Sequence, residues 1–279
     1  MERAFKEFIG IPEKAGVVMV IEKEFGPWGV EDWVKIAQGI ASIVKITFGT
    51  AALYSEDILR EKLRIYREAN IQPMVGGTLT EVAILSRGGY TRKDLQEYLS
   101  YIKKLGFTYL EFSDGSIFIP EDKRREIIKL VREAGLRVIS EVGKKDPKKD
   151  ALLTMEKRIE LMKKDLDSGS EMVIIEARES GKGIGVMDKE GKIDFRELDS
   201  IIKEVGLEKT MIEAPEKNQQ QAIFMRYGPQ ANIGNVQPRD ILSVGALRAG
   251  LRGDTIMVLR KEDWKKYHES QKAPKEYLI

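Results

Sequence analysis

Residues 108–141 read TYLEFSDGSIFIPEDKRREIIKLVREAGLRVISE and contain one complete unit of a repeated pattern. Two short apolar runs, TYLEF and RVISE, enclose a segment in which Ile127, Ile128 and Val131 recur with helical spacing. The segment stops at Gly135, and glycine adopts the left-handed conformation that ends helices without steric cost. The stretch therefore predicts a strand, a helix and a second strand.

The same pattern recurs along the chain. Short runs of aliphatic and β-branched residues are typical of strands buried on both faces, as in parallel sheets. The eight runs are VVMVIE (17–22), SIVKIT (42–47), QPMV (72–75), TYLEF (108–112), RVISE (137–141), EMVIIE (171–176), TMIE (210–213) and ANIG (231–234). Amphipathic segments separate them, so the chain alternates strands with helices.

This alternation, with no break in composition, predicts one α/β domain over residues 1–279, a (β/α)8 TIM barrel. An open doubly wound sheet is the alternative. No Gly-x-Gly-x-x-Gly sequence follows the first strand, which weakens a dinucleotide-binding fold. The chain becomes highly charged from about residue 252, and we expect this extension to cap the barrel or to pack on a neighbouring molecule.

The composition excludes several kinds of chemistry. The chain has no cysteine and one histidine, His268, so thiolate sites, a Ser-His-Asp triad and a multi-histidine metal site are not available. The net charge of +2 predicts neither a nucleic-acid nor a membrane partner. No apolar run is long enough to span a membrane and the N-terminus has no signal-peptide core, so we expect a soluble, cytoplasmic protein.

Acidic residues mark the ends of the predicted strands, where (β/α)8 barrels carry their active sites. Five of the eight strands finish on glutamate. Three of these residues, Glu111, Glu141 and Glu176, come from neighbouring strands and must be paired with cations or protonated. We expect them to bind Mg²⁺, which prefers hard oxygen ligands, with Asp114 as the next choice. The alternative is a ring of structural salt bridges.

Glycine-rich loops at the same ends predict an anion site. Backbone without side chains lets several N–H groups approach an anion, and both the loop at 76–78 and the loop at 181–185 fit this description. For the second loop we expect phosphate contacts from the residues Arg178, Gly181, Lys182 and Gly183. The alternative for each loop is an ordinary turn.

Six segments together resemble the phosphosulfolactate synthase family, whose members join sulfite to phosphoenolpyruvate in coenzyme M biosynthesis. They are GGTLTEVA (76–83), LEFSDGSI (110–117), SEVGKKDP (140–147), VIIEARESGKGIGVMDKEGK (173–192), IEAPEKNQQ (212–220) and LRAGLRGDT (247–255). They occur in the family's order and span nearly the whole chain. The resemblance implies a (β/α)8 barrel that forms a homo-oligomer.

The resemblance also implies a reaction. Sulfite adds to the methylene carbon of phosphoenolpyruvate, negative charge develops on the carboxylate, and the phosphate-bearing carbon takes up a proton. The resemblance assigns the role of proton donor to Lys145. Our candidates for binding sulfite or the substrate carboxylate are Lys23 and Lys45, and Mg²⁺ would hold the carboxylate.

Three segments on the predicted rim depart from the family pattern. The chain has ITFGTA (46–51) where archaeal members tend to carry FGWGTS, and IEKE (21–24) in place of an LDKG-like run. It also has Ile117 and Phe118 where some members carry a more polar pair. These departures leave open a barrel enzyme that adds or eliminates a different nucleophile on a phosphorylated carboxylate. Plant heat-stress-associated proteins also resemble the family, so a non-catalytic homologue is the third possibility.

Overall fold

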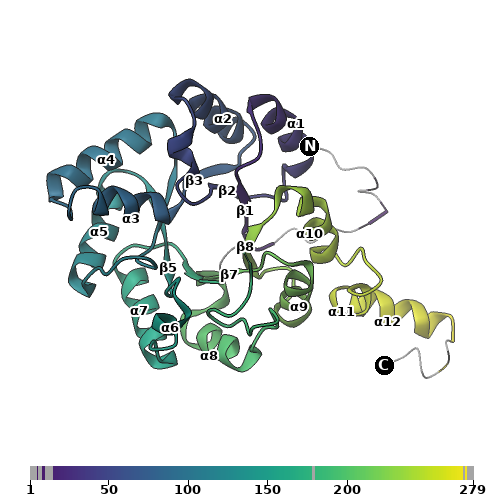
Figure 1. Ribbon diagram of the computed structural model, residues 1–279. Coiled ribbons are helices and arrows are strands. Elements are labelled where there is room, and N and C mark those ends of the chain that lie inside the picture. Colours follow the sequence, from purple (N-terminus) through teal and green to yellow (C-terminus); the bar gives the residue numbers. More distant parts are fainter. Residues whose placement is uncertain (1–4, 6–7, 10–14, 178–179, 273, 275–279) are drawn as a thin grey trace.

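The computed structural model describes residues 15–177 and 180–272, together with residues 5, 8, 9 and 274. Eight parallel strands pair in chain order, and the last strand pairs with the first to close a barrel. Helices surround this barrel, as Figure 1 shows. The prediction of a single (β/α)8 barrel is thus confirmed.

All eight predicted strands are present, each within two residues of its expected bounds. They are β1 (Val18–Glu22), β2 (Ile43–Ile46), β3 (Gln72–Val75), β4 (Tyr109–Phe112), β5 (Arg137–Val142), β6 (Val173–Ile175), β7 (Thr210–Glu213) and β8 (Asn232–Val236). Their short lengths agree with strands that are covered on both faces.

One principal helix follows each strand and packs on the outside of the barrel. These helices are α1 (Pro27–Ala37), α2 (Glu56–Glu68), α4 (Arg92–Leu105), α5 (Glu121–Glu133), α7 (Met155–Asp167), α8 (Phe195–Val205), α9 (Lys217–Tyr227) and α10 (Ile241–Arg248). Further elements lie in the connections: η1 (Thr50–Leu53), α3 (Gly77–Leu85), α6 (Pro147–Asp150), η2 (Leu207–Lys209) and η3 (Pro238–Asp240). In the part of the chain that the structure describes, no helix combines the length and apolar character needed to cross a membrane.

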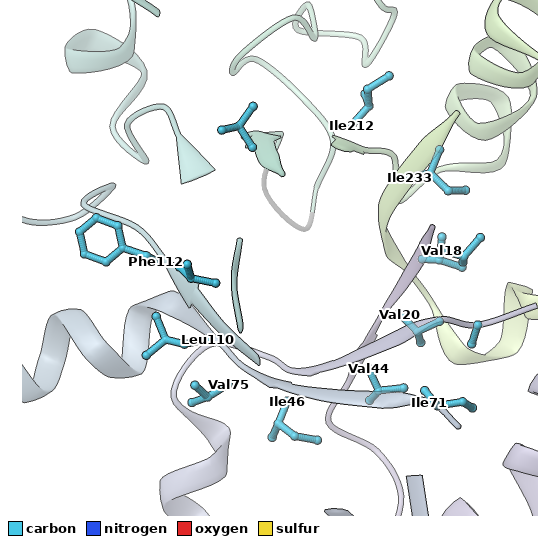
Figure 2. Close-up of a cluster of buried hydrophobic side chains, with 14 of the residues drawn as sticks. Val18, Val20, Val44, Ile46, Ile71, Val75, Leu110, Phe112, Ile212 and Ile233 are labelled. Atoms are coloured by element: carbon cyan, nitrogen blue, oxygen red, sulfur yellow. The ribbon is translucent and has the colours of Figure 1, made fainter. Parts of the chain in front are cut away.

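Strand residues alternate between the helix layer and the barrel interior, as the two-residue period of a strand requires. The residues that face the helices, such as Val18, Val20, Val44 and Ile46, belong to the larger hydrophobic core, part of which Figure 2 shows. Each such fully buried side chain contributes about 1.5–3 kcal/mol. A smaller, methionine-rich cluster fills the interior: Met19, Ile43, Met74, Tyr109, Ile139, Met172, Ile174 and Met211.

The same alternation brings acidic side chains into the barrel mouth. Glu111 lies two residues beyond the interior residue Tyr109, and Glu213 lies two residues beyond Met211. Each glutamate therefore continues the interior face of its strand toward the carboxyl end. The apolar layer below and the acidic layer above are consequences of one strand period.

Glu22 is out of phase with this pattern because it lies three residues beyond the interior residue Met19. Its side chain enters the helix layer, where Lys62 lies 2.8 Å from its Oε2 atom and the Tyr66 hydroxyl donates to the same atom at 3.0 Å. Burial and the charge of Glu22 raise the pKa of Tyr66. Glu22, which ends the first strand, therefore stabilises the packing of the helix layer and does not belong to the barrel mouth.

The charged extension forms α11 (Ile256–Leu259) and α12 (Lys261–Ser270). Arg260 lies between these two helices, and its Nε atom donates a hydrogen bond to the Ala249 carbonyl at 3.0 Å. This bond connects the beginning of α12 to the end of α10. Figure 1 shows α12 extending away from the barrel. In the single chain, α12 does not cap the mouth, and packing on a neighbouring molecule stays a prediction.

Candidate active site

Lys45 joins two of the strand-end glutamates inside the mouth. Its Nζ atom lies 2.6 Å from Glu111 Oε1 and 3.3 Å from Glu213 Oε1, and all three side chains are buried. Backbone amides satisfy the other carboxylate oxygens: Gly77 N donates to Glu111 at 2.8 Å, and Ala177 N donates to Glu213 at 2.9 Å. Burial would raise the pKa of Glu111, but the charges of Lys45 and Lys145 and the hydrogen bonds from Lys45 and Gly77 together outweigh it, so this pKa lies below its ordinary value.

Lys145 joins two further glutamates on the neighbouring strands. Its Nζ atom lies 2.9 Å from Glu176 Oε2 and 3.4 Å from Glu141 Oε1, and its side chain is 30% exposed. Both carboxylates are buried. The lysine therefore faces the mouth and is accessible from it.

These two groups form one site, which we call the mouth cluster. Its members are Lys45, Glu111, Glu141, Lys145, Glu176 and Glu213. Four carboxylates and two ammonium groups give a net charge of −2 when all are ionised. Buried charge of one sign is costly unless a counter-charge or a proton compensates it.

The pKa values in the mouth cluster agree with this imbalance. Burial is the largest cause that raises the pKa of Glu141, and the charge of Glu176 raises it further. Burial also raises the pKa of Glu213, despite the opposing charge of Lys45. Burial alone would lower the pKa of Lys45 and of Lys145, but the surrounding carboxylates outweigh it and both values lie above the ordinary lysine pKa. Both lysines are therefore protonated at neutral pH.

A divalent cation fits the carboxylate side of the mouth cluster. Glu111, Glu141 and Glu213 each offer an oxygen, and these oxygens lie within 4.8 Å of one another. Hard oxygen ligands of this kind are those that Mg²⁺ binds. Its charge of +2 would also neutralise the cluster.

The metal site predicted from the sequence has Glu176, and not Glu213, as its third carboxylate. In the structure Glu176 lies on the Lys145 side of the mouth cluster, whereas Glu213 groups with Glu111 and Glu141. The signal for Glu213 was present in the sequence, because this residue ends the TMIE run two positions beyond Met211.

The reserve ligand Asp114 is already engaged. Arg124 Nη1 lies 2.9 Å from its Oδ1 atom, and Lys144 Nζ lies 2.7 Å from its Oδ2 atom. The adjacent lysines of the EVGKK segment therefore separate: Lys144 pairs with Asp114, and Lys145 enters the mouth cluster.

The glycine loop predicted to hold phosphate makes internal contacts. The Gly183 N–H donates to the Asp188 carbonyl at 2.8 Å, so this amide is used within the loop itself. Lys182 Nζ lies 3.5 Å from Glu216 Oε1, and its side chain is half exposed. Gly181 has a left-handed φ of 63°. The loop is thus a turn held by its own hydrogen bonds, and the ammonium group of Lys182 is its one exposed cation. The predicted phosphate contacts of this loop stay predictions.

Two other predicted anion ligands, Lys23 and Arg178, are not among the residues whose contacts define the mouth cluster. Lys23 is exposed on the rim, with its Nζ atom 5.3 Å from the centre of the Phe48 ring. Arg178 lies outside the described residues. Lys45 alone among the predicted sulfite or carboxylate ligands belongs to the mouth cluster as the structure describes it.

Fold and site together define a (β/α)8-barrel protein with a buried ionic cluster where enzymes of this fold place their active sites. The sequence profile of the family described as (2R)-phospho-3-sulfolactate synthase (ComA) matches residues 7–254. The chain belongs to this phosphosulfolactate synthase family.

Individual relatives agree with this assignment. The phosphosulfolactate synthase of Methanocaldococcus jannaschii is 41% identical over 250 residues, which are 90% of this chain and 97% of the relative. That of Methanothermobacter thermautotrophicus is 37% identical over 247 residues, which are 88% and 93% of the two chains. The crystal structure of orotidine 5'-phosphate decarboxylase from Pyrococcus horikoshii has a TM-score of 0.54 at 11% identity, covering 83% of this chain and 98% of that one. This last likeness concerns the barrel fold alone.

Proposed function

We propose that this protein is a phosphosulfolactate synthase, a carbon–sulfur lyase type of enzyme that adds sulfite to phosphoenolpyruvate with the help of Mg²⁺. Family membership supports the activity. The observation that carries the chemistry is the mouth cluster, because it combines a protonated lysine with buried carboxylates whose excess negative charge a divalent cation would neutralise. Homo-oligomeric assembly and a cytoplasmic location are further expectations of this proposal.

In the proposed reaction the sulfur lone pair of sulfite forms a bond to the methylene carbon of phosphoenolpyruvate. The electron pair of the carbon–carbon double bond moves toward the α-carbon and its carboxylate. A proton then reaches the α-carbon, and the phosphate ester stays intact. The product, (2R)-phosphosulfolactate, contains the atoms of both substrates and the one added proton.

Glu111, Glu141 and Glu213 are the residues that would hold Mg²⁺. When bound, the ion stabilises the negative charge that develops on the substrate carboxylate. Lys45 contributes a fixed positive charge beside two of these residues. We therefore expect the carboxylate end of the substrate to lie on this side of the mouth cluster.

Lys145 is the proposed proton donor. Its pKa lies above the ordinary lysine value because Glu141 and Glu176 surround it, so it holds its proton at neutral pH. The raised pKa does not prevent transfer, since the carbanion-like α-carbon formed by sulfite addition is a much stronger base than an amine. Lys145 then regains a proton from water at the exposed mouth.

The test is consumption of phosphoenolpyruvate by the purified protein, followed by phosphorus NMR with and without sulfite and Mg²⁺. We expect a new phosphate-ester signal when both are present, and no reaction after a chelator removes the metal. Sulfite-independent consumption would favour a lyase that uses another nucleophile. Absence of any reaction would favour the non-catalytic homologue.

A further inference from the structure

Glu81 is a buried carboxylate that the reaction proposed above does not use. It lies on α3 and is 1% exposed. Within the described residues it forms no ion pair with a lysine or arginine. It accepts hydrogen bonds from the Ser113 hydroxyl and, at 2.9 Å, from the Ser116 amide. Burial of a carboxylate without a cation costs free energy. The two hydrogen bonds offset part of this cost, and the presence of Glu81 at this position calls for a structural or functional explanation.

The two bonds fix the loop that follows β4. Ser113 and Ser116 flank Gly115, whose carbonyl accepts a hydrogen bond from the Lys145 amide at 3.0 Å. The loop also packs on the lysine stem, because a Cβ atom on Gly115 would lie 2.9 Å from Lys145 Cγ. Glu81 is thus connected to Lys145 through one short and closely packed segment.

Helix α3 connects to the other half of the mouth cluster as well. Its first residue, Gly77, donates to Glu111 Oε2 at 2.8 Å. A Cβ atom on Gly77 would lie 2.4 Å from Ser113 Oγ, so the helix start and the loop after β4 are in direct contact. The helix therefore contacts the metal-binding side at its start and, through Glu81, the loop after β4 that packs on Lys145.

We propose that Glu81 is a positioning residue for Lys145. It fixes the loop after β4, and this loop sets where the Lys145 ammonium lies relative to Glu176 and to the substrate. The catalytic consequence rests on the proposed function of Lys145, whereas the positioning itself rests only on the contacts above.

The test compares Glu81→Ala with Glu81→Gln in the full chain. Glutamine keeps a carbonyl oxygen for the Ser116 amide, and its NH₂ group can donate to the Ser113 hydroxyl, so it preserves both hydrogen bonds. In the alanine variant we expect exchange of the Lys145 amide hydrogen to become at least about tenfold faster. We also expect kcat to fall by about 10- to 100-fold, as for other residues that orient a catalytic group, with little change in KM. The glutamine variant should stay close to the wild type in both measurements.

Thr80→Val is the matched control. Thr80 is the neighbouring buried residue on α3, and its hydroxyl lies 3.1 Å from the Tyr98 hydroxyl, away from the loop after β4. This variant should lower the melting temperature without changing Lys145 amide exchange or kcat. Ser113→Ala tests the link from the loop side, because it removes the hydroxyl that donates to Glu81 and adds no atom near Lys145. It should lower kcat in the same direction as Glu81→Ala, even if Glu81→Ala does not fold.

The proposal is overturned if Glu81→Ala or Ser113→Ala leaves both the Lys145 amide exchange and kcat at wild-type values. It is also overturned if Thr80→Val reproduces the Glu81→Ala effects, because helix stability would then explain them. If the wild type shows no sulfite-dependent turnover, the proposed function fails. The exchange comparison still decides whether Glu81 fixes Lys145.

Discussion

Replacement of Lys145 by alanine removes the ammonium group that faces Glu176 at 2.9 Å and Glu141 at 3.4 Å. The net charge of the mouth cluster then changes from −2 to −3. Loss of one partner of a buried ion pair costs about 3–5 kcal/mol, and uptake of a proton by Glu141 would reduce this cost. Loss of a general acid lowers turnover by at least about a hundredfold, which corresponds to about 2.7 kcal/mol of transition-state stabilisation.

Two further variants separate proton donation from charge and stability. Lys145→Arg keeps the positive charge, but a guanidinium does not deprotonate in proteins, so it should fold like the wild type and turn over as slowly as Lys145→Ala. Lys144→Ala is the matched control in the adjacent position, since Lys144 pairs with Asp114 instead of the mouth cluster. The side chains of Lys144 and Asp114 are only 22% and 13% exposed, so this variant should lower the melting temperature. It should still lose less activity than Lys145→Ala, because the mouth cluster keeps both of its ammonium groups.

The assay is the initial rate of sulfite-dependent phosphoenolpyruvate loss at saturating Mg²⁺, with the melting temperature measured for each variant. We expect a large loss in kcat for both Lys145 variants and a smaller one for Lys144→Ala. Wild-type kcat in Lys145→Arg would remove this residue from the proton-transfer step. Equal losses for Lys144→Ala and Lys145→Ala would show that the two lysines are not separated as the structure indicates.

Three other predictions follow from the mouth cluster and its loops. By calorimetric titration, Glu213→Gln should weaken Mg²⁺ binding at least about tenfold and more than Glu176→Gln does; the reverse order would contradict the metal site. In metal-free protein the pKa of Glu141 is raised, so the folding stability of the wild type falls as pH rises above the ordinary glutamate pKa of 4.5. Glutamine carries no charge at any pH. The melting temperature of Glu141→Gln should therefore exceed that of the wild type by more at pH 8 than at pH 5. An equal gain at both pH values would mean that Glu141 is ionised throughout. Gly183 and Gly185 both have a left-handed φ, so alanine at either position costs roughly 1–2 kcal/mol of backbone strain. Gly183→Ala has open space around it, whereas Gly185→Ala also places a Cβ atom 2.1 Å from the Glu176 carbonyl oxygen and should therefore cost more stability. Equal denaturation midpoints for the two variants would refute this.

The fold was predictable because each strand and helix carries its own signal. The apolar runs coincide with the strands, and the glycines at 106, 135 and 206 have the positive φ values of 117°, 76° and 96° that helix ends favour. These signals are local, so a sequence displays them directly. The direction of α12 has no such local signal in the sequence, and Figure 1 shows this helix leaving the barrel instead of covering it.

The candidate site was predictable only in part. Glu111 and Glu141 follow interior residues at the two-residue period, and the structure brings them together as expected. The same two-residue period places Glu213 in the mouth and Glu22 outside it, in the helix layer. A simple count of strand-end glutamates does not distinguish these two residues. Attention to phase, and not only to residue type, therefore identifies which acids share the mouth.

The roles of loop residues could not be read from the sequence. The Gly183 amide is used by the Asp188 carbonyl, and Lys144 is drawn to Asp114, because of contacts between residues that no periodic pattern relates. Glu81 has the same origin: nothing in its segment shows that it will reach the loop after β4. Such contacts depend on how loops pack, which is determined by the whole fold.

The central claim is that side chains from β2, β4, β5, β6 and β7 form one site for a metal ion and a proton donor. Its most direct test is a crystal structure with Mn²⁺ in place of Mg²⁺ and with phosphoenolpyruvate, in which anomalous scattering locates the ion. We predict an ion at bonding distance, about 2.1 Å, from oxygens of Glu111, Glu141 and Glu213, with the α-carbon of the substrate facing Lys145. An ion bound elsewhere, or substrate with its α-carbon turned away from Lys145, would contradict the account.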